Sequence, residues 1–398
     1  MKDGKPNTQR IGWIFALGHG HYTQFLNFRD YLDGDGSAMM LGLTGELPPS
    51  TFPLARLLPH PVRHRLGEIQ QVAVGLASHA RCDTLFIACE NTGLMRFVRR
   101  FPSFLYTDLS PSLKRELSPW YVHQFSRIAP LQAMREHAHA RVARACRGVF
   151  TMSTWAARGI SHDYRVPPER VHVVLPGANL RRWHRVDRRG RPAHRPIRVL
   201  MVGGQFRRKG GELLLDWAER TRARNWEMDI VTWPGELPEW IRTALGNPGA
   251  DEPAAAALGP RLPHVRIHCG VRANTPELTH LFEEADVFCL PTQADGSSIA
   301  SLEAMATGLP VLVSAVGGIP DLVEDGKTGL LLRRGDAGDL AAKIEALISD
   351  AALRESLGSA ARNACEAHLN VERQLREIRA CIARCAPRSS DLLDSQET

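Results

Sequence analysis

Lysine is scarce in this chain, since only six of its 50 basic residues are lysines and the others are arginines. A net charge of +7 can indicate a nucleic-acid-binding protein. The densest basic cluster, however, lacks the interleaved aromatic side chains of a single-strand binding surface. It consists of Arg181, Arg182, Arg185, Arg188, Arg189, Arg191, Arg195 and Arg198. We therefore expect no nucleic-acid partner, and interpret the cluster as a solvated linker or, alternatively, as a weak contact with anionic lipid headgroups.

The eight cysteines, at positions 82, 89, 146, 269, 289, 365, 381 and 385, form no CxxC pair. This argues against a zinc site and against a disulfide framework in a chain of 398 residues. Because no group of histidines, cysteines and carboxylates has ligand spacing, we expect no metal and no other cofactor. The residues before Gly18 include seven apolar side chains, too few for a signal peptide or a membrane span. A cytoplasmic protein is expected, with at most a peripheral contact at the inner face of the membrane.

Short apolar runs alternate with helical patterns along the chain. The runs predict strands at Ile11–Leu17, Thr84–Cys89, Phe104–Thr107, Gly148–Met152, Val171–Leu175, Ile197–Val202, Met228–Thr232, Val265–His268, Val287–Leu290 and Val311–Ser314. Such alternation indicates βαβ units and parallel sheets. We therefore predict an α/β protein with two Rossmann-like, doubly wound domains that face one another across a cleft, where the C-terminal strand ends bind ligands.

The segment VDRRGRPAHRP, residues 186–196, separates the two sets of predicted strands and contains one glycine and two prolines. We therefore expect an N-terminal domain over residues 1–185, a basic linker over 186–196, a C-terminal domain over 197–387 and a disordered polar tail over 388–398. With 43% apolar residues, each domain can bury a core of its own.

The most informative segment is residues 285–332, which begins ADVFCLPTQADGSSIASLEAMATGLPVLVS. After its first strand, Ser297 or Ser298 is suited to cap a helix that continues to about Thr307, where Gly308 ends it. A helix N-terminus offers unpaired N–H groups and a partial positive charge, so an anion such as a phosphate can bind there.

Two acidic residues accompany this predicted helix. Glu303 lies within it and Asp295 lies just before it. Carboxylates are suited to accept hydrogen bonds from the vicinal hydroxyls of a ribose or a hexose. The segment therefore predicts a combined phosphate and sugar site.

The same residues, DGSSIASLEAMATGLPV, resemble the signature of the retaining GT-B glycosyltransferases of glycosyltransferase family 4: an acidic residue, seven others and Glu, followed by AMA.GLPV. The resemblance implies that Asp295 contacts the donor sugar and that Glu303 contacts the nucleotide ribose. Asp295 stands where the family usually has Glu. Further donor-binding residues implied by the resemblance are Gly296, Ser297, Ser298 and Ile299.

A second motif, GGQFRRKGGELLLDWAE, follows the predicted strand Ile197–Val202. Gly203 and Gly204 allow a tight turn, and Arg208 and Lys209 stand between this turn and the next helix. Two adjacent basic residues are common at a solvated helix end, which is the alternative interpretation. Family members carry a similar VG…RKG segment whose Arg and Lys bind the donor diphosphate, and the resemblance implies the same role here. Fixed cations at this point would stabilise the charge that develops on the departing diphosphate.

The N-terminal half offers fewer candidates. Gly18 follows the first predicted strand, in a loop that the resemblance places near the donor phosphates and the acceptor. His19 and His21 are therefore candidate acceptor-binding residues. Asp108 follows the predicted strand Phe104–Thr107, where family members often have a residue that touches the transferred sugar or the acceptor hydroxyl. A turn or helix cap is the alternative role for Asp108.

The resemblance implies transfer of a hexose from a nucleotide diphosphate sugar to a hydroxyl of a glycan, a lipid-linked acceptor or a small molecule. The anomeric configuration would be retained, and protein cations would replace a metal. The implied catalytic residues are Asp108, Arg208, Lys209 and Asp295. Two alternatives stay open: an epimerase or hydrolase of nucleotide sugars with the same fold, and a nucleotide-sugar-binding protein without turnover.

Overall fold

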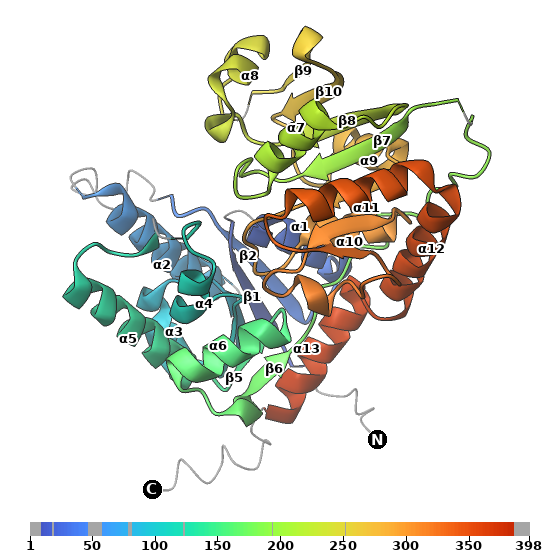
Figure 1. Ribbon diagram of the computed structural model, residues 1–398. Coiled ribbons are helices and arrows are strands. Elements are labelled where there is room, and N and C mark those ends of the chain that lie inside the picture. Colours follow the sequence, from blue (N-terminus) through green and yellow to red (C-terminus); the bar gives the residue numbers. More distant parts are fainter. Residues whose placement is uncertain are drawn as a thin grey trace, which may run out of the picture. The chain divides into compact units, whose positions relative to one another are not determined.

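The computed structural model describes residues 9–17, 20–46, 58–78, 82–121, 124–192, 194–250 and 252–385. The chain divides into two compact units (Figure 1). Unit 1 combines Met1–Leu113, His123–Val174 and Glu372–Thr398, whereas unit 2 combines Lys114–Val122 and Leu175–Val371. The predicted basic linker, residues 186–196, therefore lies inside unit 2. The predicted polar tail lies outside the described residues.

Unit 1 contains a six-stranded parallel sheet of order β2-β1-β3-β4-β5-β6. Its strands are β1 (Ile11–Ala16), β2 (Ala38–Leu43), β3 (Thr84–Ala88), β4 (Ser103–Tyr106), β5 (Gly148–Thr151) and β6 (Val171–Val173). Its helices are α1 (Gly20–Leu32), α2 (His60–Ser78), α3 (Met95–Arg100), α5 (Ala129–Ala145), α6 (Thr154–Tyr164) and α13 (Val371–Cys385), and α4 (Pro111–Glu116) crosses the boundary to unit 2. Ser153 caps α6, because its side chain accepts from the Ala156 N–H at 3.0 Å.

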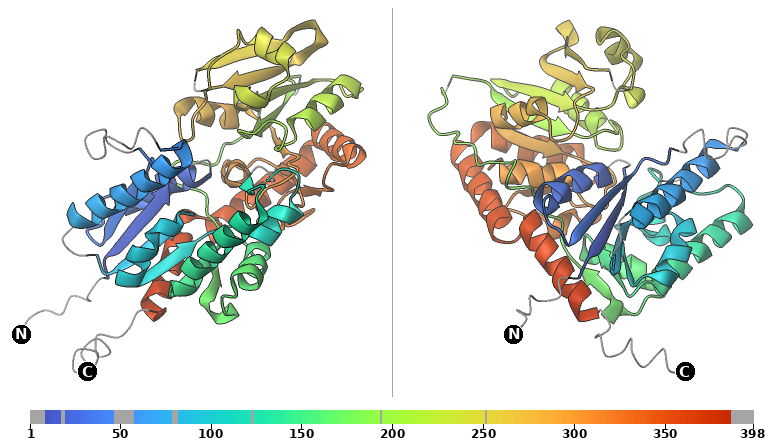
Figure 2. Two further views of the ribbon diagram at one scale, coloured as in Figure 1. Left: turned by 90° about the vertical axis from the view of Figure 1, so that its left-hand side faces the viewer. Right: turned by 180° about the vertical axis from the view of Figure 1, so that it is seen from behind.

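The two faces of this sheet differ in chemistry because side chains alternate along each strand. One face is aromatic: the ring of Phe86 in β3 lies 4.8 Å from that of Trp13 and 5.8 Å from that of Phe150. Phe28 of α1 covers this face, with its ring 5.7 Å from that of Trp13. The opposite face is aliphatic and packs against helices that include α2, α3 and α5. Helices therefore cover both faces of the sheet (Figure 2).

Unit 2 contains a seven-stranded sheet of order β13-β12-β11-β7-β8-β10-β9, in which only β9 is antiparallel to its neighbour. Its strands are β7 (Ile197–Val202), β8 (Trp226–Val231), β9 (Ala254–Leu258), β10 (Leu262–Cys269), β11 (Val287–Leu290), β12 (Val311–Ser314) and β13 (Leu330–Leu332). Its helices are α7 (Gly211–Arg220), α8 (Glu239–Ala244), α9 (Pro276–Glu284), α10 (Ile299–Ala306), α11 (Ala337–Ser349) and α12 (Ala351–Ala367). Strands β8, β9 and β10 extend the sheet on one side of β7, whereas β11, β12 and β13, which follow them in the chain, extend it on the other side. The strand order therefore reverses between β7 and β11.

All ten predicted strands are present, although the ends of several differ from the predicted bounds. The prediction missed β2, β9 and β13. An alanine run such as AAAAL in β9 has low strand propensity, and the three residues of β13 are too few for a pattern.

The arginine-rich segment is not a solvated linker. Arg188 donates from Nε to the Ala285 carbonyl at 2.8 Å and from Nη1 to the Thr307 carbonyl at 2.7 Å. Its Nη2 donates to the Phe282 carbonyl at 2.9 Å. These acceptors include the last carbonyls of α9 and its C-cap, which have no partner within the helix, so the cation satisfies them and interacts favourably with the helix dipole.

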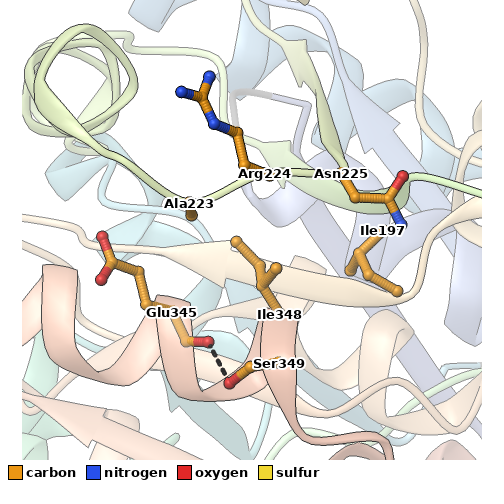
Figure 3. Close-up of a pocket in the computed structure, with 7 residues that line it drawn as sticks. All are labelled: Ile197, Ala223, Arg224, Asn225, Glu345, Ile348 and Ser349. Carbon is orange, nitrogen blue, oxygen red and sulfur yellow. Dashed lines mark hydrogen bonds between the residues drawn. The ribbon is translucent and has the colours of Figure 1, made fainter.

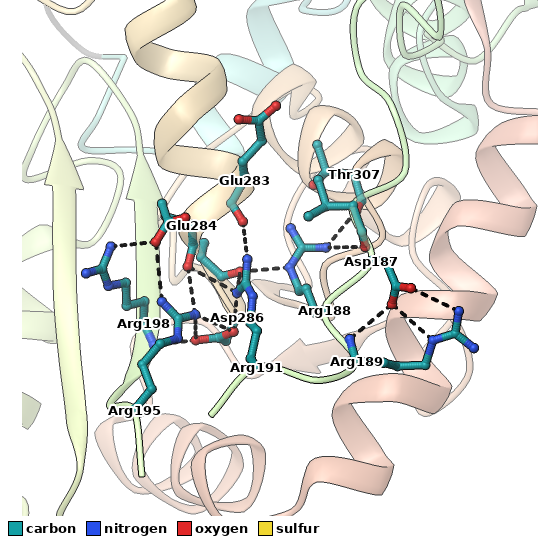
Figure 4. A network of polar contacts seen from close by, with 12 residues as sticks. Asp187, Arg188, Arg189, Arg191, Arg195, Arg198, Glu283, Glu284, Asp286 and Thr307 are labelled. Atoms are coloured by element: carbon teal, nitrogen blue, oxygen red, sulfur yellow. Dashed lines mark hydrogen bonds and ion pairs between the residues drawn. The ribbon is translucent and has the colours of Figure 1, made fainter. Parts of the chain in front are cut away.

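Asp286 binds two further arginines of the segment. Its Oδ1 lies 2.5 Å from Arg191 Nη1, and its Oδ2 lies 2.8 Å from Arg195 Nη2 and accepts from the Arg198 N–H at 2.9 Å (Figure 4). The side chains of Arg191 and Arg195 are only 22% and 20% exposed. Segment 186–196 is therefore fastened to the body of unit 2 by charged hydrogen bonds.

Within the described residues, no helix is long and apolar enough to cross a membrane.

Candidate functional site

Three loops of unit 2 meet at the C-terminal edge of its sheet. They follow β7, β11 and β12, which are neighbours in the sheet because β11 pairs with both other strands. The loops after β7 and β11 flank the point where the strand order reverses. Such a switch point is where open α/β sheets bind their ligands.

The loop after β7 carries the predicted glycines and cations. A Cβ atom on Gly203 would lie 2.7 Å from Cγ of Lys209, and one on Gly204 would lie 2.5 Å from the ring of Trp233. Gly210 has φ of +86°, and a Cβ there would lie 2.1 Å from the Pro291 carbonyl oxygen. Glycine is therefore required for the loop to fold this tightly against the start of the loop after β11.

Arg208 and Lys209 converge on Asp295. Lys209 Nζ lies 2.5 Å from Asp295 Oδ2, and Arg208 Nη1 lies 3.7 Å from Asp295 Oδ1. The exposed fractions are 13% for the Arg208 side chain, 14% for Lys209 and 9% for Asp295. Burial lowers the pKa of Lys209, while Asp295 acts in the opposite direction. Two cations therefore face one carboxylate in a largely desolvated place, which leaves an excess of positive charge.

Further contacts of Arg208 orient its guanidinium group. Its Nε donates to Gln205 Oε1 at 2.5 Å, and its Nη1 donates to the Ala294 carbonyl and to the Tyr121 hydroxyl, the latter at 3.3 Å. The guanidinium carbon also lies 5.6 Å from the centre of the Tyr121 ring. Tyr121 belongs to the segment Lys114–Val122 of unit 2. The sequence analysis missed this residue, since it lies 87 positions away in the chain.

The helix after the Asp295 loop is α10, and Ser298 is its N-cap as predicted. Ser298 Oγ accepts from the Ser301 N–H at 3.2 Å. Ser297 Oγ is buried and has no hydrogen-bond partner among the described residues. A buried hydroxyl without a partner is costly unless a ligand or water satisfies it. Gly296 and Ile299 flank this pair, so the predicted loop residues lie together at the helix start.

Glu303 lies deeper in α10 and is only 3% exposed. Its Oε1 atom has no hydrogen-bond partner among the described residues. Burial raises the pKa of Glu303 to about 8, and the nearby charge of Arg182 opposes that rise only in part. A buried carboxyl group with an unused oxygen is suited to accept hydrogen bonds from a ligand that enters from the strand edge.

The third loop, after β12, closes against the Asp295 loop. Gly318 N–H donates to the Gly296 carbonyl at 3.0 Å. Gly317 has φ of +57°, and a Cβ there would lie 1.9 Å from the Asp295 carbonyl oxygen. The glycine doublet therefore lets two loop backbones touch behind the carboxylate.

The candidates of unit 1, Gly18 for the donor and His19, His21 and Asp108 for the acceptor, are less completely described. Gly18 and His19 lie outside the described residues. His21 lies at the start of α1, and its Nδ1 is buried without a hydrogen-bond partner among the described residues. Asp108 follows β4 and is half-buried. Its charge adds to the effect of burial, which raises the pKa of the neighbouring Tyr106.

A second polar group of unit 1, missed by the sequence analysis, follows β3. Asn91 Nδ2 donates to Glu68 Oε2 at 2.8 Å, and both residues are buried. The order of the unit 1 sheet reverses between β1 and β3. Asn91 therefore lies at the edge where such a sheet binds its ligands. The only signal for this residue in the sequence is a polar side chain that follows an apolar strand.

One pocket of about 370 Å³ lies elsewhere in unit 2 (Figure 3). It is lined by Ile197, Ala223, Arg224, Asn225, Glu345, Ile348 and Ser349. Ile197 begins β7, and Asn225 precedes β8, so the pocket lies at the N-terminal ends of the strands. It is therefore on the sheet edge opposite to the three loops and does not belong to the candidate site.

Part of the chain is similar to known glycosyltransferases. Residues 186–364 match the model of the family "Glycosyl transferases group 1". A D-inositol 3-phosphate glycosyltransferase of Arthrobacter sp. strain FB24 is 31% identical over 250 residues, 58% of this chain and 54% of that protein. An MMP alpha-(1->4)-mannosyltransferase of Mycolicibacterium hassiacum is 30% identical over 224 residues, 56% of this chain and 50% of that protein. The chain thus spans about half the length of these curated relatives.

Solved structures match nearly the whole chain. Sucrose-phosphate synthase from Thermosynechococcus elongatus has a TM-score of 0.69 and 17% identity, and the match covers 94% of this chain and 98% of that chain. Anabaena Alr3699/HepE in complex with UDP-glucose has a TM-score of 0.65 and 17% identity, with 94% and 100% covered. These likenesses show the GT-B fold. The residues that match the family model, 186–364, include all predicted donor-site residues of unit 2.

Proposed function

We propose that this protein transfers a hexose from a nucleotide diphosphate sugar to an acceptor hydroxyl, with retention of the anomeric configuration. The observation that carries the proposal is the convergence of Arg208 and Lys209 on Asp295, at the switch point of the unit 2 sheet. The curated relatives support glycosyl transfer, and one structural neighbour, Anabaena Alr3699/HepE, binds UDP-glucose.

The cations suit a diphosphate leaving group. As the anomeric carbon–oxygen bond breaks, negative charge accumulates on the diphosphate, and preorganised cations stabilise that charge more than they stabilise the bound substrate. Without a ligand, Lys209 is held by Asp295 at 2.5 Å. A diphosphate that enters the site exchanges one ion pair for another, so the lysine remains compensated throughout. Protein cations would then supply the charge that a divalent metal supplies in other transferases.

Glu303 and Asp295 would hold the two sugars of the donor. Glu303 Oε1 lacks a partner among the described residues, so a ribose hydroxyl that donates to it removes an unsatisfied buried acceptor. Asp295 would receive hydroxyls of the hexose once Lys209 moves to the phosphates. When Asp295 accepts hydrogen bonds from the hexose hydroxyls, it is poorly placed to attack the anomeric carbon as a nucleophile. We therefore favour front-face attack by the acceptor, with the leaving phosphate taking the acceptor proton, and with much of the rate due to alignment of the two substrates.

The acceptor would bind to unit 1, through His19, His21 and Asp108. The names of the curated relatives suggest that phosphorylated polyols and sugar acceptors should be tested first. Attachment to anionic lipid stays a hypothesis with little support, because Arg188, Arg191 and Arg195 are engaged inside unit 2.

A binding experiment tests the donor site. A panel of nucleoside diphosphates and nucleotide sugars is screened by thermal shift, since a ligand at one hundred times its dissociation constant stabilises a protein by about 2.7 kcal/mol. The best pair is then titrated into two variants. Glu303→Ala should weaken the free nucleoside diphosphate, whereas Asp295→Asn should leave its affinity unchanged or higher, since it frees Lys209. Only the nucleotide sugar should lose affinity in Asp295→Asn, and equal losses of the bare nucleotide in both variants would contradict these roles.

Turnover distinguishes the enzymatic alternatives. The release of nucleoside diphosphate is measured with and without candidate acceptors. Release that depends on an acceptor supports transfer, whereas release into water alone indicates a hydrolase. Tight donor binding without any release would indicate a binding protein.

A further inference from the structure

A cluster of three metal-ligating side chains lies in unit 1, far from the donor loops in the sequence and on a different sheet. His172 of β6 and Cys381 and Cys385 of α13 each offer one ligand atom, and these atoms all lie within 4.8 Å of one another. The sequence analysis expected no such cluster, because the histidine and the cysteines are about 200 positions apart in the chain. Only the fold brings them together.

The fold places each member on the aromatic face of the unit 1 sheet. His172 pairs in register with Phe150 of β5, and their rings lie 5.5 Å apart. Cys381 and Cys385 are four residues apart on α13, a spacing that puts both thiols on one side of a helix. Cys381 is buried, while His172 and Cys385 are half-buried.

Two contacts independent of the cluster hold α13 on this sheet. Gln374 Nε2 donates to the Tyr106 hydroxyl at 3.1 Å, and that hydroxyl also accepts from Gln24 of α1 at 2.9 Å. Farther along α13, Arg379 Nη2 donates to Asp35 Oδ2 at 2.5 Å. The helix is therefore positioned before any ligand binds, so that the two thiols and the imidazole are preorganised.

The imidazole is incompletely satisfied. His172 Nε2 is buried and has no hydrogen-bond partner among the described residues. Thiols are weak hydrogen-bond donors and acceptors and do not readily compensate for such a loss. An imidazole beside two thiols, with one buried nitrogen unsatisfied, is the pattern that a bound metal ion would explain.

We propose that His172, Cys381 and Cys385 bind a zinc ion, with water in the fourth position. Two thiolates and an imidazole are ligands that Zn²⁺ favours, and thiolates select against magnesium and calcium. Tetrahedral zinc, with Zn–S of about 2.3 Å and Zn–N of about 2.0 Å, requires ligand atoms roughly 3.5–4 Å apart. The cluster meets this requirement with small rotamer adjustments, since its atoms lie within 4.8 Å.

Binding has an opposing cost. Burial and the adjacent Cys385 together raise the pKa of the Cys381 thiol to about 11, so zinc must displace the proton of this thiol. Arg384 acts in both directions, because its positive charge repels a cation but favours thiolates. Two thiolates would neutralise the charge of the ion. The site would then tie α13 to the edge strand β6 and stabilise unit 1.

Metal content tests the proposal directly. The full-length protein, freed of any affinity tag, is produced with zinc in the medium, passed through metal-free gel filtration under reducing conditions and measured by elemental mass spectrometry. We expect about one zinc per chain in the wild type, and less than a tenth of that in Cys385→Ser and in His172→Ala. Cys82→Ser is the matched control, because Cys82 is also half-buried in unit 1 but lies outside the cluster.

Cobalt substitution provides a second readout that does not depend on how zinc is acquired. Co²⁺ bound by two thiolates gives sulfur-to-metal charge-transfer bands and visible bands typical of tetrahedral coordination. Both should appear in the wild type and in Cys82→Ser and be absent from Cys385→Ser, whose partly exposed position favours a folded variant. Zinc content that is equal in all variants, or a Cys381–Cys385 disulfide in place of metal in the purified wild type, would overturn the proposal.

Discussion

Replacement of Glu303 by Gln should change how the stability of unit 2 depends on pH. The carboxyl group is 3% exposed, and burial raises its pKa from 4.5 to about 8. The folded protein therefore holds a proton that the unfolded chain releases above pH 4.5. The stabilisation linked to this proton is fully present below pH 4.5 and is lost as the pH rises towards about 8.

The size of the effect follows from the shift in pKa. One pKa unit corresponds to 1.36 kcal/mol, so a shift from 4.5 to about 8 amounts to roughly 5 kcal/mol as an upper limit. Gln has nearly the shape of a protonated Glu but does not titrate. We therefore expect Glu303→Gln to match the wild type near pH 4.5 and to be more stable by roughly 2–5 kcal/mol near pH 8.

The measurement must report on unit 2, because a chain with two units does not guarantee a single unfolding transition. Hydrogen exchange of peptides from β11 and α10, taken from pH 5 to 8.5, gives the local free energy of opening. The exposed Glu239→Gln is a suitable control and should parallel the wild type. If Glu303→Gln kept the pH slope of the wild type, Glu303 would not hold the proton, and the burial argument would be refuted.

Nucleotide binding provides an independent check of the same carboxyl group. A ribose hydroxyl that donates to Glu303 favours the ionised form, so binding near pH 7 should release part of a proton. Calorimetry in buffers of different ionisation enthalpy measures that release. Glu303→Gln should abolish it.

Three other outcomes are expected. Lys209→Ala should lower turnover at least 100-fold, which corresponds to a loss of about 2.7 kcal/mol of transition-state stabilisation. The unfolding midpoint should change much less. A variant with wild-type rates would show that the lysine does not belong to the site. Asp286→Ala should destabilise unit 2 by about 3–5 kcal/mol, because it leaves Arg191 and Arg195 without their buried carboxylate, and urea unfolding with unchanged midpoint would contradict this. Glycosyl transfer should persist in excess EDTA at 25 °C in Cys385→Ser, a background that removes the proposed zinc site; loss of activity that magnesium restores would refute catalysis without a metal.

The parallel-strand framework and the loops at the C-terminal edge of the unit 2 sheet could be predicted because their signals are local. Ser298 precedes α10 directly, and the spacing of Asp295 and Glu303 around that helix start is visible in a stretch of nine residues. The turn of Gly203 and Gly204 is equally local. Such features need only backbone propensity and a knowledge of where parallel sheets bind ligands.

Contacts between distant segments could not be predicted in this way. Tyr121 reaches Arg208 across 87 residues, and the carboxylate of Asp286 fastens Arg191 from 95 residues away. A run of arginines looks the same in a sequence whether it is solvated or bound to helix carbonyls, since composition does not reveal which acceptors lie nearby. The interpretation of residues 186–196 as a solvated linker was wrong for this reason.

The cysteines illustrate the same limit. A search for ligands by spacing finds CxxC pairs but overlooks a site that joins an edge strand to a helix about 200 residues later. Cys289 in β11 and Cys381 in α13 are both buried, but of the two it is Cys381 that lies beside His172 and a second thiol. The chemistry of a cysteine in this protein therefore depends on the topology of unit 1 and not on the local sequence.

The discontinuity of unit 1 has a consequence for biosynthesis. Its sheet is built from the first half of the chain, yet α13, which follows all of unit 2, supplies Gln374 and Arg379 to the same unit. During translation the ribosome completes the sheet of unit 1 long before α13 emerges. Until then the aromatic face beside Tyr106 lacks part of its cover, and unit 2 can fold first. Cellular folding of this protein should therefore finish with its amino-terminal unit, in the reverse of the order in which the two units are begun.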